Sequence, residues 1–205
     1  MENTPAYELR SARFLASDVR RLVVKEGDVV IDATLGNGHD TLELAQLVGE
    51  TGHVYGFDIQ KDAVEHTRAR LENEGLAVRC SLYQLGHEQM LTKVSVPVRY
   101  VSFNLGWLPG GDKTITTLWP TTKKALESAL SLLLPLGVCT VCAYPGHLEG
   151  DHERSELMQF LSRLRPQDFN VLHQHFLNAG EGAPECFVIQ KQTCCTYTIE
   201  SDNEE

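Results

Sequence analysis

The chain has 205 residues, of which 42% are hydrophobic and 22% charged, and its formal net charge is −10. This composition is typical of one soluble globular domain, and the acidic balance alone argues against a nucleic-acid-binding protein. No apolar stretch approaches the roughly 20 residues that span a bilayer. The first ten residues, MENTPAYELR, lack the basic start and apolar run of a signal peptide, so we expect a cytoplasmic protein.

Hydrophobic periodicity predicts an alternation of helices and strands along the chain. A leading helix is expected over residues 7–23, whose basic residues Arg10, Arg13, Arg20 and Arg21 form either a solvated face or a contact for phosphates. Helices are expected over residues 42–48, 61–75, 86–91, 121–133 and 151–164. Strands are expected over residues 28–34, 52–59, 76–83, 98–106, 137–146, 169–177 and 185–192.

Strands separated by helices predict a mostly parallel α/β sheet with helices on both faces. The last two of the seven strands follow one another without a helix, so we expect an antiparallel C-terminal hairpin. We expect one domain over residues 1–192 and an acidic, disordered tail over residues 193–205. A ligand should bind at the carboxyl ends of the parallel strands.

Six cysteines need an explanation. Cys139 and Cys142 form a C-x-x-C motif, but residues three apart on a strand point to opposite faces. Cys80 and Cys186 also lie in apolar runs, where free cysteine commonly acts as a small core residue. No grouping of ligands typical of zinc accompanies them, so we predict no metal site and no disulfide framework.

The stretch DATLGNGHDT, residues 32–41, lies between the first predicted strand and the next helix. Gly36 and Gly38 allow the backbone to approach a ligand closely. Thr41 stands where the dinucleotide fingerprint requires a third glycine, which disfavours an NAD-binding loop. Asp40 is expected to cap the helix, with Glu43 as its reciprocal partner.

Three further features point to a nucleoside ligand with a positive charge. Asp58 ends the second strand, 22 positions after Gly36, near the spacing at which an acid meets ribose hydroxyls. Asp32 ends a buried strand and therefore needs a partner, such as an amino group of a ligand. The loop after the third strand contains Leu85, Gly86 and His87, which are candidate contacts for an adenine. We expect His87 to be a surface histidine and not a catalytic residue. Further candidates in these loops are Thr34, Asn37, Asp40, Thr41 and Gln60.

The stretch FNLGWLPGGDK, residues 103–113, is the most specific motif. An Asn at the end of a strand, followed three residues later by an aromatic, is similar to the N-P-P-[YF] signature of amino-group methyltransferases. The Asn104 carbonyl can accept a hydrogen bond from a substrate amine, and Trp107 can stack on a base. Gly110 helps to shape a tight loop. Because the amine must lose a proton, Asp112 and His147 are the candidate general bases.

Together, DATLGNGHDT, FDIQ, FNLGWLPGGDK and YPGHLEG resemble the small bacterial methyltransferases long labelled rRNA methylases. Members of that family methylate 5-aminomethyl-2-thiouridine at the tRNA wobble position. The resemblance covers residues 5–191 and implies a Rossmann-like class I methyltransferase fold, S-adenosylmethionine as donor and a tRNA anticodon arm as substrate. The donor site it implies contains Asp32, Gly36, Asn37, Gly38 and Asp58. The acceptor site it implies contains Asn104, Gly106, Trp107, Asp112, Lys113, Tyr144 and His147.

Trp107 departs from the tyrosine that this family generally has, which keeps the stacking surface but removes a hydroxyl. Three alternatives stay open: a methyltransferase of rRNA or of a small amine, a catalytically silent module that binds S-adenosylmethionine or RNA, and, least favoured, an NAD enzyme. A homodimer is also left open.

Overall fold

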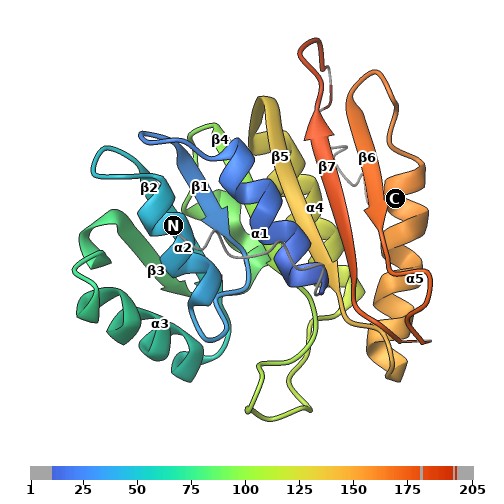
Figure 1. The fold of residues 1–205 in the computed structure, drawn as a ribbon, viewed down its shortest axis with the longest axis horizontal. Coiled ribbons are helices and arrows are strands. Elements are labelled where there is room, and N and C mark those ends of the chain that lie inside the picture. Colours follow the sequence, from blue (N-terminus) through green and yellow to red (C-terminus); the bar gives the residue numbers. More distant parts are fainter. Residues whose placement is uncertain (1–10, 181, 196, 198–205) are drawn as a thin grey trace, which may run out of the picture.

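The computed structural model describes residues 11–180, 182–195 and 197. Its centre is a seven-stranded sheet in the order β3-β2-β1-β4-β5-β7-β6. The strands are β1 (Val29–Asp32), β2 (His53–Asp58), β3 (Cys80–Gln84), β4 (Val98–Asn104), β5 (Leu133–Ala143), β6 (Phe169–Gln174) and β7 (Glu185–Lys191). Figure 1 shows this sheet with the loop between β4 and α4 extending beyond its lower edge.

The first five strands pair in parallel, whereas β7 is antiparallel to both β5 and β6. This confirms the predicted mostly parallel sheet and its antiparallel hairpin. The order shows in addition that β7 inserts between β5 and β6, so the last strand does not form the edge. The carboxyl ends of β1, β2 and β4 therefore meet at one edge of the sheet.

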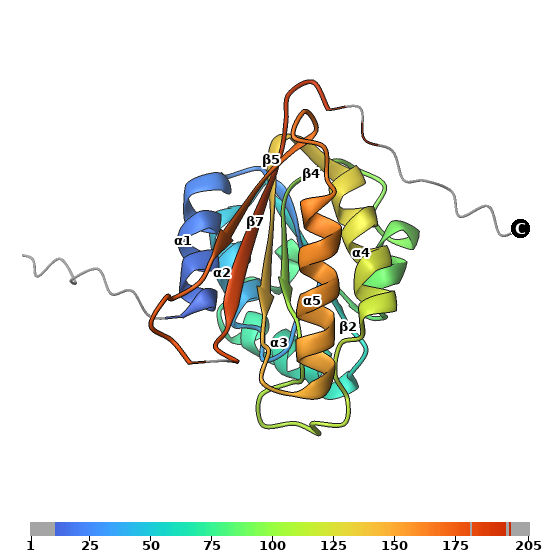
Figure 2. The same ribbon diagram turned by 90° about the vertical axis from the view of Figure 1, so that its right-hand side faces the viewer.

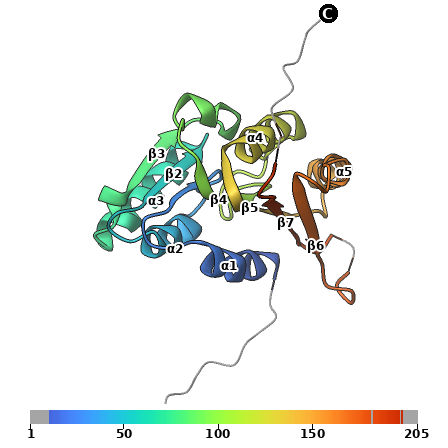
Figure 3. The same ribbon diagram turned by 90° about the horizontal axis from the view of Figure 1, so that it is seen from above.

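Helices cover both faces of the sheet (Figures 2 and 3). They are α1 (Ala12–Val23), α2 (His39–Leu47), α3 (Lys61–Asn73), α4 (Trp119–Leu132) and α5 (Leu148–Ser162), with short 3-10 helices at Ala77–Arg79 and His87–Thr92. Seen from above, α1, α2 and α3 lie on one face, and α4 and α5 lie on the other (Figure 3). No helix among the described residues has the length and apolar character needed to cross a membrane.

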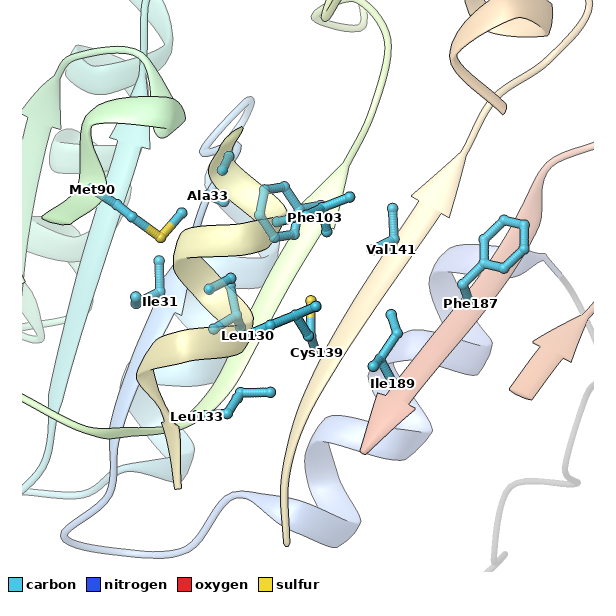
Figure 4. Packing of buried hydrophobic residues seen from close by; sticks show 14 of the residues in the cluster. Ile31, Ala33, Met90, Phe103, Leu130, Leu133, Cys139, Val141, Phe187 and Ile189 are labelled. Carbon is cyan, nitrogen blue, oxygen red and sulfur yellow. The ribbon is translucent and has the colours of Figure 1, made fainter. Parts of the chain in front are cut away.

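The larger hydrophobic core lies between the sheet and the two helices α4 and α5. Figure 4 shows side chains of this core, among them Phe103 of β4, Val141 of β5, Phe187 of β7 and Leu130 of α4. Each of these four side chains is at most 2% exposed. Complete burial of such a side chain stabilises the fold by about 1.5–3 kcal/mol. This packing holds the strand ends that carry the candidate site.

The cysteines of the apolar runs behave as core residues, as expected. Cys139, Cys142 and Cys186 are buried, Cys80 is half-buried, and all four are free thiols. Among the described residues, no group of three or more His, Cys, Asp or Glu side chains is placed to hold a metal ion.

Several predicted boundaries are shifted. The start of the third predicted strand, residues 76–83, is wrong because Ala77–Arg79 forms a 3-10 turn before β3 begins at Cys80. β5 begins at Leu133, four residues earlier than predicted. The leading helix begins at Ala12 in the described chain, and Arg10 lies outside the described residues, as does most of the tail over residues 193–205.

Candidate active site

A cavity of about 690 Å³ opens where the carboxyl ends of the parallel strands meet. It brings together thirteen of the predicted residues: Thr34, Gly36, Asn37, Asp40, Asp58, Gln60, Gly86, His87, Asn104, Gly106, Trp107, Tyr144 and His147. Seven predicted residues do not line it: Asp32, Gly38, Thr41, Leu85, Gly110, Asp112 and Lys113. The donor and acceptor motifs, although about 70 positions apart, therefore share one cavity.

The two glycines of the loop after β1 serve different purposes. Gly36 has φ +52° and lines the cavity, and an added Cβ there would make an ordinary van der Waals contact with Leu108 Cδ1 at 3.7 Å without a clash. Gly38 has φ +75°, and its Cβ would lie 2.7 Å from Thr67 Oγ1 and 2.9 Å from Thr67 Cα of α3. Gly36 thus leaves room for a ligand, whereas Gly38 lets α3 pack against the loop.

This difference predicts separable effects of two alanine substitutions. Gly38→Ala should lower the free energy of unfolding by about 3 kcal/mol, because it adds a clash with α3 to the left-handed strain. Gly36→Ala should cost only about 1 kcal/mol from strain. Because its new methyl group projects into the cavity, Gly36→Ala should instead weaken S-adenosylmethionine binding. Urea unfolding and calorimetric titration measure both quantities, and equal destabilisation by the two variants would contradict this assignment.

Asp58 is fixed by backbone donors at the end of β2. Its Oδ2 accepts from Gly36 N at 3.0 Å, and its Oδ1 accepts from Gln60 N at 2.9 Å. Burial raises the pKa of Asp58 above its ordinary value, although these backbone N–H groups oppose that effect. Each carboxylate oxygen keeps acceptor capacity for a ligand hydroxyl.

Asp32 lies beneath the cavity and is fully buried. Its Oδ2 accepts from Thr41 Oγ1 at 2.6 Å, and its Oδ1 accepts from Thr34 N at 3.2 Å. Burial raises the pKa of Asp32 to about 7. Thr41 and Thr34 therefore supply the partner that buried Asp32 was expected to need, and a ligand is not required for that role. Thr41 stands where a dinucleotide-binding loop has its third glycine, and its hydroxyl donates a hydrogen bond to the Asp32 carboxyl.

The expected cap of α2 is also wrong. The helix begins at His39 with Gly38 as its N-cap, and Asp40 lies in the first turn without capping it. Asp40 Oδ2 instead pairs with Arg20 Nη2 at 3.0 Å. Glu43, the expected reciprocal partner, pairs with Arg20 Nε at 3.3 Å. Asp40 cannot cap the helix because the helix already begins at His39, with Gly38 at positive φ as its N-cap.

Arg20 is consequently unavailable to phosphates, since its side chain is fully buried. Arg21 contacts Glu43 as well. Of the predicted basic face, Arg13 alone among the described arginines lines the cavity. The basic N-terminal segment is therefore divided: Arg20 belongs to the interior, and Arg13 to the edge of the site.

His87 is buried, contrary to the expectation of a surface histidine. It is 8% exposed, its ring stands edge-on to Phe103 at 5.7 Å, and burial lowers its pKa. Leu85 packs against the hydrophobic core instead of lining the cavity. Ile59 and Glu88, which the sequence did not single out, line the cavity. Ile59 is 56% exposed, and an apolar side chain directly after Asp58 was the available signal.

The acceptor loop is anchored through the α5 side of the cavity. Gly106 N donates to Thr117 Oγ1 at 2.7 Å, and Thr117 Oγ1 donates to Glu153 Oε2 at 2.6 Å. Glu153 is 3% exposed and also accepts from Thr122 Oγ1 at 2.6 Å. Burial raises its pKa above the ordinary value. This network holds both ends of the loop, and sequence reasoning missed it because its members lie on separate elements.

Trp107 contacts both His147 and Lys113. Its ring centroid is 4.2 Å from that of His147, and Lys113 Nζ lies 5.4 Å from the Trp107 ring. His147 is the N-cap of α5, and its Nδ1 accepts from Gly150 N at 3.2 Å. That bond engages Nδ1, whereas Nε2 of His147 is buried and has no hydrogen-bond partner among the described residues.

Asp112 does not reach the cavity. It is exposed, and its Oδ1 accepts from Thr114 N and Thr114 Oγ1, both at 2.8 Å. These bonds lower its pKa below the ordinary value. Of the two candidate general bases, Asp112 therefore lies outside the cavity, whereas His147 lines it and stays a candidate.

Asn104 is the central polar group of the acceptor side. Its backbone N donates to Thr34 Oγ1 at 2.7 Å, and its Nδ2 donates to Asp40 Oδ2 at 2.9 Å. Its Oδ1 is buried and has no hydrogen-bond partner among the described residues. A buried carbonyl oxygen without a partner is costly, so it is suited to a donor that arrives with a ligand.

Comparisons with known proteins agree with this arrangement. Residues 54–190 match the protein-family model described as "Putative rRNA methylase". A curated relative, the chloroplastic tRNA (mnm(5)s(2)U34)-methyltransferase of Arabidopsis thaliana, is 39% identical in an alignment of 179 residues that covers 82% of this chain. The match spans 65% of that relative, just under two thirds of its length.

Two solved structures superpose closely. A protein described as a "putative rRNA-methylase" from Clostridium thermocellum is 39% identical, with a TM-score of 0.88 over 90% of this chain and all of that one. A "putative methyltransferase" from Streptococcus mutans, solved in complex with SAH, is 31% identical, with a TM-score of 0.82 over 90% of this chain and 99% of that one. The chain therefore belongs to the rRNA methylase family and has the class I methyltransferase fold.

Proposed function

We propose that this protein is an S-adenosylmethionine-dependent N-methyltransferase that acts on the aminomethyl group of 5-aminomethyl-2-thiouridine at the tRNA wobble position. The observation that carries the proposal is the buried, unpartnered Oδ1 of Asn104, a residue that lines the same cavity as the loop after β1 and Trp107. The named tRNA methyltransferase relative supports the choice of substrate.

The residues of the cavity fit the proposed donor. Asp58 keeps acceptor capacity for ribose hydroxyls, and Gly36 leaves the space that a side chain would fill. Ile59 and Glu88 provide an apolar surface and an acceptor for an adenine. S-adenosylmethionine bound there would supply an electrophilic methyl group.

The acceptor side would hold a flat base with an attached amine. Trp107 offers a stacking surface, and the Asn104 carbonyl would accept from an amine N–H and direct the nitrogen lone pair. An alkylamine with a pKa of about 10.4 costs roughly 4–5 kcal/mol to deprotonate at neutral pH. With Asp112 outside the cavity, desolvation in the site is the main means of favouring the neutral amine.

Methyl transfer to synthetic anticodon stem-loops tests this proposal. The stem-loop carrying 5-aminomethyl-2-thiouridine should gain one methyl group in a single turnover, detected by nucleoside mass spectrometry, whereas the unmodified stem-loop should gain none. Binding of S-adenosylmethionine without transfer would favour the silent module. Transfer only to rRNA or to a free small amine would favour the alternative substrates. We propose in addition that the protein acts in the cytoplasm and that residues 1–192 form its catalytic domain.

Arg13 is the basic residue whose replacement should weaken RNA binding most directly. Arg13→Ala should weaken stem-loop binding and reduce the slope of log K against log salt by about 1, as expected for one lost phosphate contact. Arg163→Ala is the control, since it follows α5 at the end opposite to the cavity and is exposed. Equal salt slopes for wild type and Arg13→Ala would exclude the phosphate contact.

A further inference from the structure

The orientation of the Asn104 side-chain amide is set by Asp40. A carboxylate can only accept hydrogen bonds, so the amide nitrogen of Asn104 must face Asp40 Oδ2, 2.9 Å away. This leaves Oδ1 on the other side of the amide. Without Asp40, the two orientations of the amide would differ little in energy, and one of them would place a donor where the acceptor now lies.

Asp40 is in turn held by Arg20 from α1. Arg20 Nη2 lies 3.0 Å from the same Oδ2 atom that accepts from Asn104, and the Arg20 side chain has no exposed area. The guanidinium also contacts Glu43 Oε2 at 3.3 Å, and Ser17 Oγ donates to Glu43 at 2.9 Å. These contacts are those of an ion pair, since none of the three guanidinium nitrogens makes a hydrogen bond of standard geometry among the described residues.

We propose that Arg20 and Asp40 are positioning residues for methyl transfer: Arg20 fixes the Asp40 carboxylate, which keeps the Asn104 carbonyl oxygen directed at the substrate amine. The assignment rests on the proposed function. Neither residue is required to touch the amine. The arrangement explains why a fully buried arginine lies beside the site, and why an acid occupies the first turn of α2 without capping it.

Asp40→Asn tests the assignment most directly. The new amide can donate to Asn104 Oδ1, so the Asn104 amide can reverse and present N–H groups to an amine that needs an acceptor. We expect kcat at saturating S-adenosylmethionine to fall by about 30-fold or more, comparable with losing one positioned polar group. Arg20→Lys should give a smaller fall, since a point charge holds the carboxylate less rigidly.

Glu43→Gln is the matched control. It removes the other carboxylate that pairs with Arg20, on the same helix, but Glu43 has no bond to Asn104. We expect its kcat to stay within about threefold of wild type. If Glu43→Gln and Asp40→Asn lower kcat equally, the effect comes from an unpaired arginine and the positioning role is wrong. A loss confined to S-adenosylmethionine affinity in Asp40→Asn would also overturn it.

A double variant provides a rescue that a merely structural role does not predict. Combining Asp40→Asn with Asn104→Asp exchanges the two groups: the amide at position 40 donates to one carboxylate oxygen at position 104, and the other oxygen faces the cavity. We expect this double variant to regain about tenfold in kcat over Asp40→Asn alone. No recovery would count against the assignment.

Side-chain amide NMR separates failure of this assignment from failure of the proposed function. In the ligand-free wild type, the Asn104 NH₂ protons should show slow exchange and a downfield shift because they bond to a carboxylate. Both features should disappear in Asp40→Asn and persist in Glu43→Gln. If the spectra agree but wild type methylates no stem-loop, the proposed function fails. If wild type is active but these protons are unprotected, the positioning role fails.

Discussion

Replacing Asn104 with alanine should lower kcat for methyl transfer by about 100- to 1000-fold, the effect of removing one polar group aimed at a reacting centre. The dissociation constant for S-adenosylmethionine should stay within about threefold of wild type. The reason is that Oδ1 of Asn104 has no protein partner to lose, and its proposed partner is the substrate amine. Single-turnover transfer and calorimetric titration measure the two quantities independently.

Thr121→Ala is a suitable control for Asn104→Ala. Thr121 also lines the cavity, but its hydroxyl already donates to Leu118 O at 2.9 Å and is not free for a substrate amine. Its replacement should leave kcat within about threefold of wild type. If Asn104→Ala weakened S-adenosylmethionine binding while kcat at saturation stayed unchanged, Asn104 would belong to the donor site.

The sheet and the position of the site were accessible from the sequence because both depend on local patterns. Short apolar runs separated by amphipathic stretches specify parallel strands, and polar residues at successive strand ends must then gather at one edge. Asp58 and Asn104 illustrate this, since each ends a strand and lines the cavity. What the strand pattern did not reveal is that β7 lies inside the sheet.

The errors arise where contacts between distant elements decide the outcome. Arg20 has the sequence context of an exposed basic face, but α1 packs against the sheet and α2, which buries the side chain against Asp40. Asp112 belongs to a long loop whose course depends on remote anchors, including the bond from Asn37 Nδ2 to Pro109 O at 3.3 Å. Spacing along the chain cannot supply such anchors, so it cannot tell which loop residues face the cavity.

The pH dependence of stability should reveal the buried carboxyl of Asp32. Its ordinary pKa is 3.8, and burial raises the folded-state value to about 7. Between these two values the folded state binds more protons than the unfolded state, so this group makes stability fall as pH rises from about 4 to about 7. The full difference corresponds to about 4 kcal/mol, at 1.36 kcal/mol for each unit of pKa.

Comparison with Asp32→Asn isolates that contribution. Other groups titrate in the same range: Asp58 and Glu153 shift in the same direction as Asp32, and Glu185 shifts oppositely. They are common to both proteins and cancel in the difference. Urea unfolding at intervals from pH 4 to pH 8 should show wild type losing stability relative to Asp32→Asn up to about pH 7 and running parallel above it. Parallel curves throughout would mean that Asp32 does not titrate there.

A cationic ligand should change this profile in a defined direction. Asp32 accepts a hydrogen bond from the backbone N of Thr34, which lines the cavity, so the positive charge of bound S-adenosylmethionine should favour the ionised carboxyl and lower its pKa. Stabilisation of wild type by S-adenosylmethionine should therefore be larger at pH 8 than at pH 6, and Asp32→Asn should lose most of that difference. An equal pH effect in both proteins would show that the ligand charge acts through another group, such as Asp58.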